Sequence, residues 1–360
     1  MSSRRSCVTL LALCTLAACD GTRVDAAQPT CRATRGSLTP AGWSASTPAT
    51  PTDAPRGALR VVADVPLPGP ASRFDYQTID AQARRLYISH MNAGTVVAFD
   101  LDSSRVAAEV GGTPRATGIL AVPARHAVYV SAAGRHELAV IDDRTLAITA
   151  RVGGIDFPDG IAWAPAEGKV FVSDEAGEAD VAIDATSNAK RSTIALGGEA
   201  GNTHYDSVSH CILVAVQTRN QLVAIDPATE RIVERYDLPG SDHPHGFTLD
   251  EPGRLAFVTS EESGVLQVLD LRTMRVLATH RVGDDPDVLA WDPAWRRLYV
   301  ASESGVVSAF VADGAELRPL GELRLPHAHT VSVDARTHRV YLPLENFHGR
   351  PVLRVLAPAP

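Results

Sequence analysis

The chain has 360 residues, a formal net charge of −8 and 45% hydrophobic residues. This length and apolar content are sufficient for one large all-β domain with a sizeable core. The acidic balance and the lack of a basic cluster argue against a nucleic-acid partner, because binding a phosphate backbone needs concentrated Lys and Arg.

The N-terminus, "MSSRRSCVTLLALCTLAACD", begins like an export signal. Arg4 and Arg5 precede an apolar run that is shorter than the roughly 20 residues needed to span a bilayer, which is typical of a signal peptide. The segment "LAAC" ending at Cys19 resembles a bacterial lipobox, and this resemblance implies cleavage before Cys19 and lipid attachment to it. We therefore expect residues 1–18 to be a lipoprotein signal peptide, with an ordinary signal peptide as the alternative.

Residues 19–57 are rich in Ala, Thr, Pro and Ser and have no helical or strand periodicity. This composition predicts a flexible tether that holds the folded part near the periplasmic side of a bacterial membrane. Two cysteines besides Cys19 remain after cleavage, Cys31 in the tether and Cys211 before an expected strand. An exported protein can form a disulfide, but the spacing does not demand one, so their pairing stays open.

From residue 58 onward the chain repeats with a period of about 42 residues. An apolar–aromatic–apolar triplet recurs with its aromatic member at Tyr87, Tyr129, Phe171, Phe257, Tyr299 and Tyr341, with one double step of 86 residues. Each repeat holds four short apolar runs, which is typical of a propeller blade. Residues 58–360 are therefore predicted to form an all-β, seven-bladed β-propeller. The last repeat offers three strands, so we expect the N-terminal strand, within 58–68, to complete the last blade.

Two of the repeats, "LYISHMNAGTVVAFDLDSSRVAAEVGG" and "VYVSAAGRHELAVIDDRTLAITARVGG", resemble the YVTN-type repeat of YncE-like β-propeller proteins. The resemblance covers residues 58–360 and implies the propeller fold. It implies little about activity, because one propeller scaffold hosts many functions. Proteins of this family are sometimes associated with DNA, an association that the acidic charge of this chain does not favour.

The first strand of each propeller blade lines the central channel, so residues at the start of these strands are expected to form a ring. Aligning the repeats places there Asp75, Thr117, Asp159, Asn202 or His204, His245, Asp287 and His329. Loops after the second strands add polar residues to the same face, among them His90, Glu175, Glu261, Glu303 and Glu345. We expect His245 and His329 to converge across the channel mouth with Asp287 between them.

Imidazole combined with carboxylate suits a divalent transition metal better than calcium, which prefers oxygen ligands. We therefore hypothesise that this face binds a small ligand, a metal or a protein partner. His245, His329 and Asp287 are the expected metal ligands, and the further ligand-binding candidates are Asp75, Asp159 and His204.

Two alternatives remain open from the sequence. One is a metal-dependent enzyme of the lactonase or lyase kind, in which His245 and His329 are the catalytic candidates. The other is an inert assembly scaffold in the cell envelope, with ordered water in the ring. The chain is expected to be a monomer whose partners are the membrane, through its lipid, and a small ligand or an envelope protein.

Overall fold

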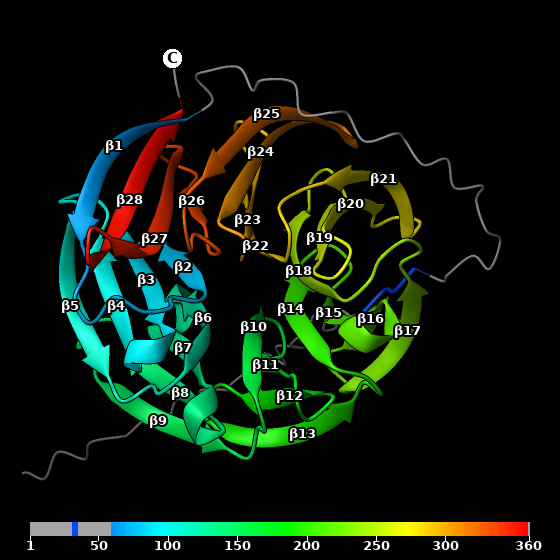
Figure 1. The fold of residues 1–360 in the computed structure, drawn as a ribbon. Coiled ribbons are helices and arrows are strands. Elements are labelled where there is room, and N and C mark those ends of the chain that lie inside the picture. Colours follow the sequence, from blue (N-terminus) through cyan, green and yellow to red (C-terminus); the bar gives the residue numbers. More distant parts are fainter. Residues whose placement is uncertain (1–30, 35–58, 359–360) are drawn as a thin grey trace, which may run out of the picture.

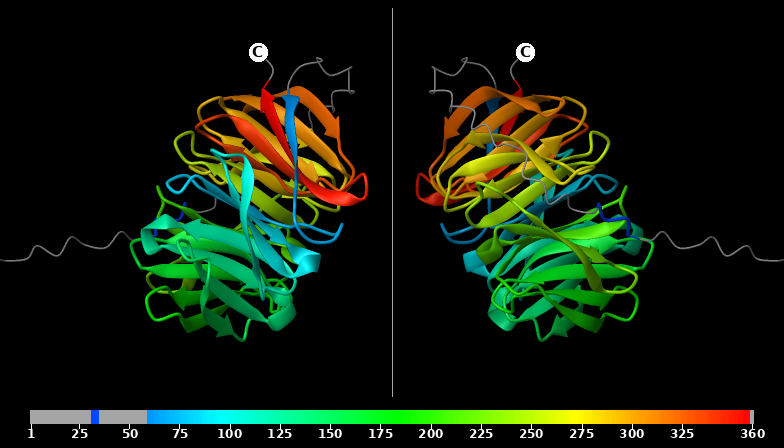
Figure 2. Two further views of the ribbon diagram at one scale, coloured as in Figure 1. Left: turned by 90° about the vertical axis from the view of Figure 1, so that its left-hand side faces the viewer. Right: turned by 90° about the vertical axis from the view of Figure 1, so that its right-hand side faces the viewer.

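The computed structural model of the protein describes residues 31–34 and 59–358 (Figure 1). In that part of the chain, 28 strands form seven antiparallel four-stranded sheets arranged around a central axis. The molecule is therefore a seven-bladed β-propeller, and the fold class predicted from the 42-residue period is confirmed. Figure 2 shows the wheel from two sides, with blades six and seven at one rim and blades two and three at the opposite rim.

Blades one to three follow one another in chain order, each from its innermost to its outermost strand. Blade one contains β2 (Gln77–Asp80), β3 (Arg85–His90), β4 (Thr95–Asp100) and β5 (Arg105–Gly111). Blade two contains β6 (Ala116–Val122), β7 (Ala127–Ala132), β8 (Glu137–Asp142) and β9 (Ile148–Gly153). Blade three contains β10 (Pro158–Ala164), β11 (Lys169–Asp174), β12 (Ala179–Asp184) and β13 (Ala189–Ala195).

The remaining blades continue around the wheel. Blade four contains β14 (Ala200–Asp206), β15 (Cys211–Val216), β16 (Gln221–Asp226) and β17 (Arg231–Asp237). Blade five contains β18 (Pro244–Asp250), β19 (Leu255–Ser260), β20 (Val265–Asp270) and β21 (Arg275–Arg281). Blade six contains β22 (Pro286–Asp292), β23 (Arg297–Ser302), β24 (Val306–Asp313) and β25 (Glu316–Arg324). Blade seven contains β26 (Ser332–Asp334), β27 (Arg339–Phe347), β28 (Arg350–Pro358) and β1 (Leu59–Pro66).

Within residues 31–34 and 59–358, four short 3-10 helices lie in the loops. They are η1 (Met91–Ala93), η2 (Pro123–Arg125), η3 (Ala133–Arg135) and η4 (Gln217–Arg219). Among the described residues, no helix has the length and apolar character that crossing a membrane requires. The predicted signal peptide, residues 1–18, the lipidation candidate Cys19 and most of the tether 19–57 lie outside the described residues.

Strand β1 pairs antiparallel with β28, from Leu59 opposite Pro358 to Pro66 opposite Val352. Asp64 on β1 also accepts two hydrogen bonds from the Arg354 guanidinium, both 2.8 Å long. The first and last strands of the wheel thus lie side by side in one sheet, as the blue and red ribbons in Figure 1 show.

The hydrophobic core lies between neighbouring blades. In β15, for example, every residue from Cys211 to Val216 is buried, because the sheets on either side cover both of its faces. Tyr129 of blade two and Val170 of blade three belong to the same buried cluster. A strand covered on both faces needs continuous apolar residues rather than an alternating pattern, which explains the uninterrupted apolar triplets of the repeat.

Strands alternate in direction within each blade, so all innermost strands begin at one face of the wheel and end at the other. We call the face where they begin the mouth face; it also carries the loops between the second and third strands. The opposite face, which we call the turn face, carries the turns between the first and second strands. In each of these turns one residue has a left-handed backbone, with φ between 50° and 63°: Arg84, His126, Gly168, His210, Arg254, Arg296 and His338.

Ion pairs join neighbouring blades on the turn face. An aspartate that ends an innermost strand contacts the left-handed basic residue of the next blade. These pairs, which we call the turn-face latches, are Asp206–Arg254 at 2.6 Å, Asp250–Arg296 at 3.7 Å, Asp292–His338 at 2.7 Å and Asp334–Arg84 at 2.7 Å. The repeat therefore places a basic residue type against an aspartate wherever one blade meets the next in this part of the wheel.

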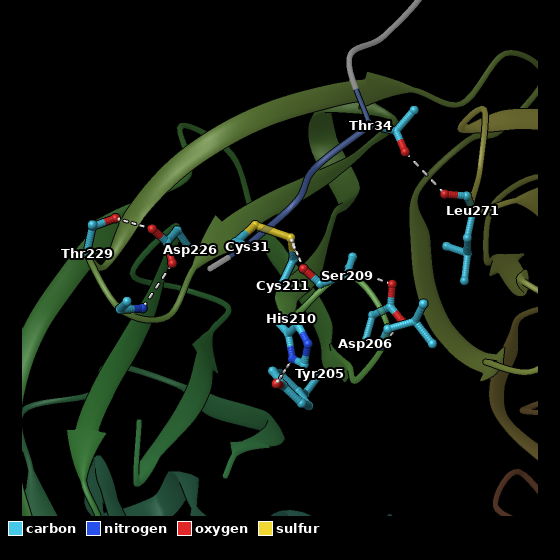
Figure 3. Close-up of a disulfide and its surroundings, with 12 residues drawn as sticks. Cys31, Thr34, Tyr205, Asp206, Ser209, His210, Cys211, Asp226, Thr229 and Leu271 are labelled. Atoms are coloured by element: carbon cyan, nitrogen blue, oxygen red, sulfur yellow. Dashed lines mark hydrogen bonds between the residues drawn. A yellow bond between two sulfur atoms is a disulfide. The ribbon is translucent and has the colours of Figure 1, made fainter. Parts of the chain in front are cut away.

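Residues 31–34 are fastened to blades four and five at the turn face (Figure 3). Cys31 and Cys211 form a disulfide, which settles the pairing that the sequence left open. The backbone N–H of Arg32 donates to the Ser209 carbonyl at 2.8 Å. The hydroxyl of Tyr236 donates to the Thr34 carbonyl at 2.5 Å, and the Thr34 hydroxyl donates to the Leu271 carbonyl at 3.4 Å. A segment remote in sequence is thereby joined covalently to the wheel.

Candidate metal site at the mouth of the channel

One residue from each blade lies at the mouth of the channel, at or just before the start of the innermost strand. We call this set the mouth ring: Asp75, Thr117, Asp159, Gly201, His245, Asp287 and His329. Five of these are ionisable, and each of the five is at most 8% exposed. Of the predicted site residues, the structure therefore brings Asp75, Asp159, His245, Asp287 and His329 together.

His204 does not belong to the mouth ring, contrary to its predicted position. A step of 42 residues from Asp159 ends at Gly201. The double step of 86 residues exceeds two repeats by two residues, and these lie between β17 and β18, after the innermost strand of blade four. His204 lies three residues further along β14 and lines a cavity of about 300 Å³ within the channel. The centroids of its imidazole ring and of the Phe247 ring lie 4.6 Å apart, with the two rings edge to face. Burial lowers the pKa of His204 to about 4, so its imidazole is neutral at pH 7.

Three carboxylates surround the imidazole of His245. Its Nε2 lies 3.5 Å from Oδ2 of Asp159, and its Nδ1 lies 3.2 Å from Oδ1 of Asp287 and 3.3 Å from Oε1 of Glu261. None of the described residues makes a well-directed hydrogen bond to Nδ1. Burial alone lowers the pKa of this imidazole, but Asp159, Asp287 and Glu261 outweigh burial and raise the pKa of His245 well above 6.5.

A second group lies beside the first one. Asp75, Asp287 and His329 each offer a possible ligand atom, and these atoms lie within 4.8 Å of one another. Oδ1 of Asp75 and Nε2 of His329 are buried without a hydrogen-bond partner among the described residues. Burial and the negative charge of Asp287 raise the pKa of Asp75 well above 3.8. Burial and the nearby Arg73 lower the pKa of His329.

Four glutamates form an outer tier above the mouth ring. They occupy the same repeat position, directly after or near the end of the second strand: Glu175, Glu261, Glu303 and Glu345. Burial together with nearby carboxylates raises the pKa of Glu175 to about 7, and burial raises that of Glu261 to about 7 although His245 opposes the shift. The sequence placed Glu261 on this face without assigning it to the site; its 42-residue spacing from Glu303 is the signal that identifies the tier.

Two residues of the site were missed from the sequence. The Tyr76 hydroxyl donates to Oδ1 of Asp287 at 3.3 Å, and the same tyrosine lines the cavity below the mouth ring. Arg73 pairs with Glu303 at 2.6 Å, close to Asp75 and Asp287. Arg73 lies in the connection from β1 to β2, two residues before Asp75, at the repeat position that holds Arg115 in blade two. The repeat therefore indicates its place at the mouth face, but not its contact with Glu303.

Glycines beside the mouth ring let neighbouring backbones come close. A Cβ on Gly246 would lie 1.7 Å from the carbonyl oxygen of Asp287, and one on Gly118 would lie 1.8 Å from that of Asp159. Side chains at these two places are therefore excluded. Thr117 also serves the backbone here, since its hydroxyl donates to the Pro158 carbonyl at 2.7 Å. Close packing of the innermost strands is what crowds the acidic side chains together.

The mouth ring is suited to bind a cation. When all are ionised, Asp75, Asp159, Asp287 and Glu261 outnumber the positive charges of His245 and Arg73, and the local potential is then negative. Mixed imidazole and carboxylate donors suit zinc, manganese, iron or related divalent ions. The predicted divalent transition metal therefore fits the residues present, with His245, His329 and the carboxylates as its possible ligands.

No family model matches the chain, and no curated protein matches its sequence significantly. Among solved structures, hydrazine synthase of Kuenenia stuttgartiensis is similar, with a TM-score of 0.67 and 17% identity over 81% of this chain and 96% of that chain. At this level of identity the similarity shows the fold alone. The chain is thus defined by its architecture as a seven-bladed β-propeller protein with an acidic, histidine-bearing channel mouth.

Proposed function

We propose that this protein is an exported YncE-like β-propeller that binds divalent transition metal at the mouth ring. The observation that carries the proposal is the position of His245 between carboxylates from blades three, five and six, all within 3.5 Å of its ring nitrogens. A buried imidazole needs one partner on each nitrogen, and a second carboxylate at the same nitrogen adds only repulsion between the acids. A metal ion removes that repulsion.

The contacts of His245 also match the way proteins hold a metal-binding histidine. Such a histidine commonly donates its second N–H to a carboxylate, which fixes the ring orientation and the tautomer. With Nδ1 as the metal ligand, Nε2 faces Asp159 at 3.5 Å. Asp287 and Glu261 lie on the Nδ1 side as the accompanying carboxylate ligands. The imidazole then separates a ligand side from a supporting side.

The disulfide supports the proposed location. Bonds such as Cys31–Cys211 persist mainly in oxidising compartments outside the cytoplasm. We propose that lipid attached to Cys19 anchors the protein on the periplasmic side of a bacterial membrane, twelve residues from this disulfide along the chain. Metabolic labelling with a fatty acid tests the anchor: the wild type is expected to carry the label and the Cys19→Ser variant to lack it. An unlabelled wild type would contradict the proposed anchor.

Metal binding is tested by thermal unfolding of chelator-treated protein with Zn²⁺, Mn²⁺ or Ca²⁺. Zn²⁺ or Mn²⁺ at about 100 times its dissociation constant is expected to stabilise the wild type by about 3 kcal/mol and to raise its Tm by several degrees. Ca²⁺ is expected to act more weakly, because imidazole is a poor ligand for it. At the same metal concentration, His245→Ala and Asp287→Asn are each expected to reduce the shift strongly, because each removes a ligand of the ion that binds most tightly.

The matched control is Asp313→Asn, which neutralises an exposed carboxylate on the turn side of blade six. It is expected to keep the full metal-induced shift. A wild type whose Tm does not respond to either transition metal contradicts the proposal. So does an Asp287→Asn variant that retains the wild-type response.

A further inference from the structure

We propose that the mouth ring holds two metal ions, with Asp287 as their shared ligand. The inference rests on the proposed function. The first ion would be bound by His245, Glu261 and Asp287, which we call the first site. The second would be bound by Asp75, Asp287 and His329, which we call the second site.

The grouping of the donor atoms is the first observation. Within each site, the three possible ligand atoms lie within 4.8 Å of one another, whereas the five residues do not fall into one such group. Metal–ligand distances of about 2.0–2.2 Å allow two donors of the same ion to be at most about 4.4 Å apart. Small side-chain rotations therefore complete either site, but one ion cannot serve all five residues without a larger rearrangement.

Unpartnered buried atoms occur in both sites, and they are the second observation. In the first site, Nδ1 of His245 has no hydrogen-bond partner among the described residues, and this side chain is about nine-tenths buried. In the second site the same holds for Oδ1 of Asp75 and Nε2 of His329, on residues that are 4% and 2% exposed. Buried polar atoms are nearly always satisfied. One ion in the first site would satisfy its own donors and leave those of the second site without a partner.

Asp287 is positioned to serve both sites. Its Oδ1 lies 3.2 Å from Nδ1 of His245 and accepts a hydrogen bond from Tyr76 at 3.3 Å. The same side chain belongs to the group with Asp75 and His329. A carboxylate is a common bridge between two ions about 3.5–4 Å apart, and such pairs activate water in many hydrolases. A pair here would connect metal binding to the alternative of a metal-dependent enzyme.

The two sites differ in their surroundings, which predicts an order of binding. Arg73 lies near Asp75, Asp287 and His329 and adds positive charge beside the second site. The first site has Asp159 as an additional carboxylate next to His245. Repulsion from Arg73 and from the first ion is therefore expected to make the second ion bind at least about tenfold more weakly.

Titration of metal-free protein with Mn²⁺ tests the inference. Equilibrium dialysis gives the number of ions bound per chain, and electron paramagnetic resonance reports whether they are close. The wild type is expected to bind two Mn²⁺, with the six-line signal of the first ion weakening as the second becomes magnetically coupled to it. His329→Ala is expected to bind one ion and to retain the six-line signal. Asp287→Asn is expected to lose the second ion and weaken the first at least tenfold.

His348→Ala is the matched control, because it removes an exposed histidine of the same face that belongs to neither site. It is expected to bind two coupled ions. A wild type that binds one ion and matches His329→Ala overturns the two-ion inference and leaves the proposed function intact. A wild type that binds no ion overturns both. The wild-type stoichiometry decides the question even if a variant fails to fold.

Discussion

The two ends of the innermost strands carry the same residue type in opposite environments. At the turn face, Asp334 accepts hydrogen bonds of 2.9 and 2.7 Å from the Arg84 guanidinium, and Asp206 is held in the same way by Arg254. At the mouth face, Asp75 and Asp159 are equally buried, yet each has an oxygen without a hydrogen-bond partner among the described residues. Burial does not distinguish Asp206 and Asp334 from Asp75 and Asp159, but hydrogen bonding to an arginine does.

The pKa values of the turn-face Asp334 and the mouth-face Asp75 are shifted in opposite directions. Burial raises the pKa of Asp334, but hydrogen bonds from Arg84 and Thr337 outweigh it and lower that pKa to about 2. Burial and like charge raise the pKa of Asp75 well above 3.8. A charge that holds blades together is matched locally, whereas a charge kept for a ligand is left unmatched until the ligand binds. The comparison teaches which carboxylates to assign to the fold and which to function.

Breaking a turn-face latch should produce the largest effect. Arg84→Met leaves the Asp334 carboxylate buried without its partner between blades seven and one, so we expect a loss of about 3–5 kcal/mol in the free energy of unfolding. Urea denaturation measures this loss. Binding of Zn²⁺ at the mouth ring should remain unchanged, because the latch lies at the opposite end of the strand.

Arg336→Met is the control for the latch, because Arg336 pairs with Asp102 in an ion pair whose side chains are 64% and 55% exposed. Exposed pairs contribute at most about 1 kcal/mol. Equal losses from Arg84→Met and Arg336→Met would show that the latches are no more important to the fold than ordinary surface charges.

Neutralising an aspartate of the mouth ring should change the free energy of unfolding by less than breaking a turn-face latch does, and should raise it instead of lowering it. In metal-free protein, Asp75→Asn is expected to raise the free energy of unfolding by about 1 kcal/mol at pH 7–8, because it removes repulsion from Asp287. The native pKa of Asp75 is raised, so the wild type loses stability as pH rises above about 3.9, the ordinary carboxyl value. The stabilising effect should therefore grow with pH and vanish below that value.

Urea denaturation across pH 3–8 checks this prediction, with Asp313→Asn as the neutral control. The same Asp75→Asn variant should bind the second metal ion more weakly, since it lacks a ligand. A destabilising effect of Asp75→Asn at pH 8 would mean that Asp75 supports the fold and belongs with the aspartates of the turn face.

Much of the fold follows from the repeat, because period and strand count together determine a propeller. The spacing of 42 residues correctly placed Asp159, His245, Asp287 and His329 around one mouth. It failed for His204, although the aspartates that end the third strands carry the missing signal. Asp226 stands 42 residues after Asp184 and 44 before Asp270, so the two additional residues come after Asp226 and Gly201 is the residue that reaches the ring. A local insertion leaves the number of blades unchanged but shifts which side chain reaches the ring.

The finer geometry of the site could not be predicted from spacing. Which carboxylates share an imidazole depends on the width of the channel, and that width depends on contacts such as Gly246 against the Asp287 carbonyl. Tyr76 and Arg73 flank Asp75 at repeat positions whose residue type differs from blade to blade, so spacing places them near the mouth but does not predict their contacts. The Cys31–Cys211 disulfide joins residues 180 positions apart, and no local pattern announces such a pairing.

The most direct test of the central claim is anomalous X-ray diffraction from crystals of the protein soaked with zinc, recorded on both sides of the zinc absorption edge. Because we propose that the unpaired carboxylates of the mouth ring bind metal, we expect two anomalous peaks beside Asp287. One should lie toward His245 and Glu261, and the other toward Asp75 and His329. If neither place shows an anomalous peak and zinc is found only at exposed surface side chains, the account is contradicted.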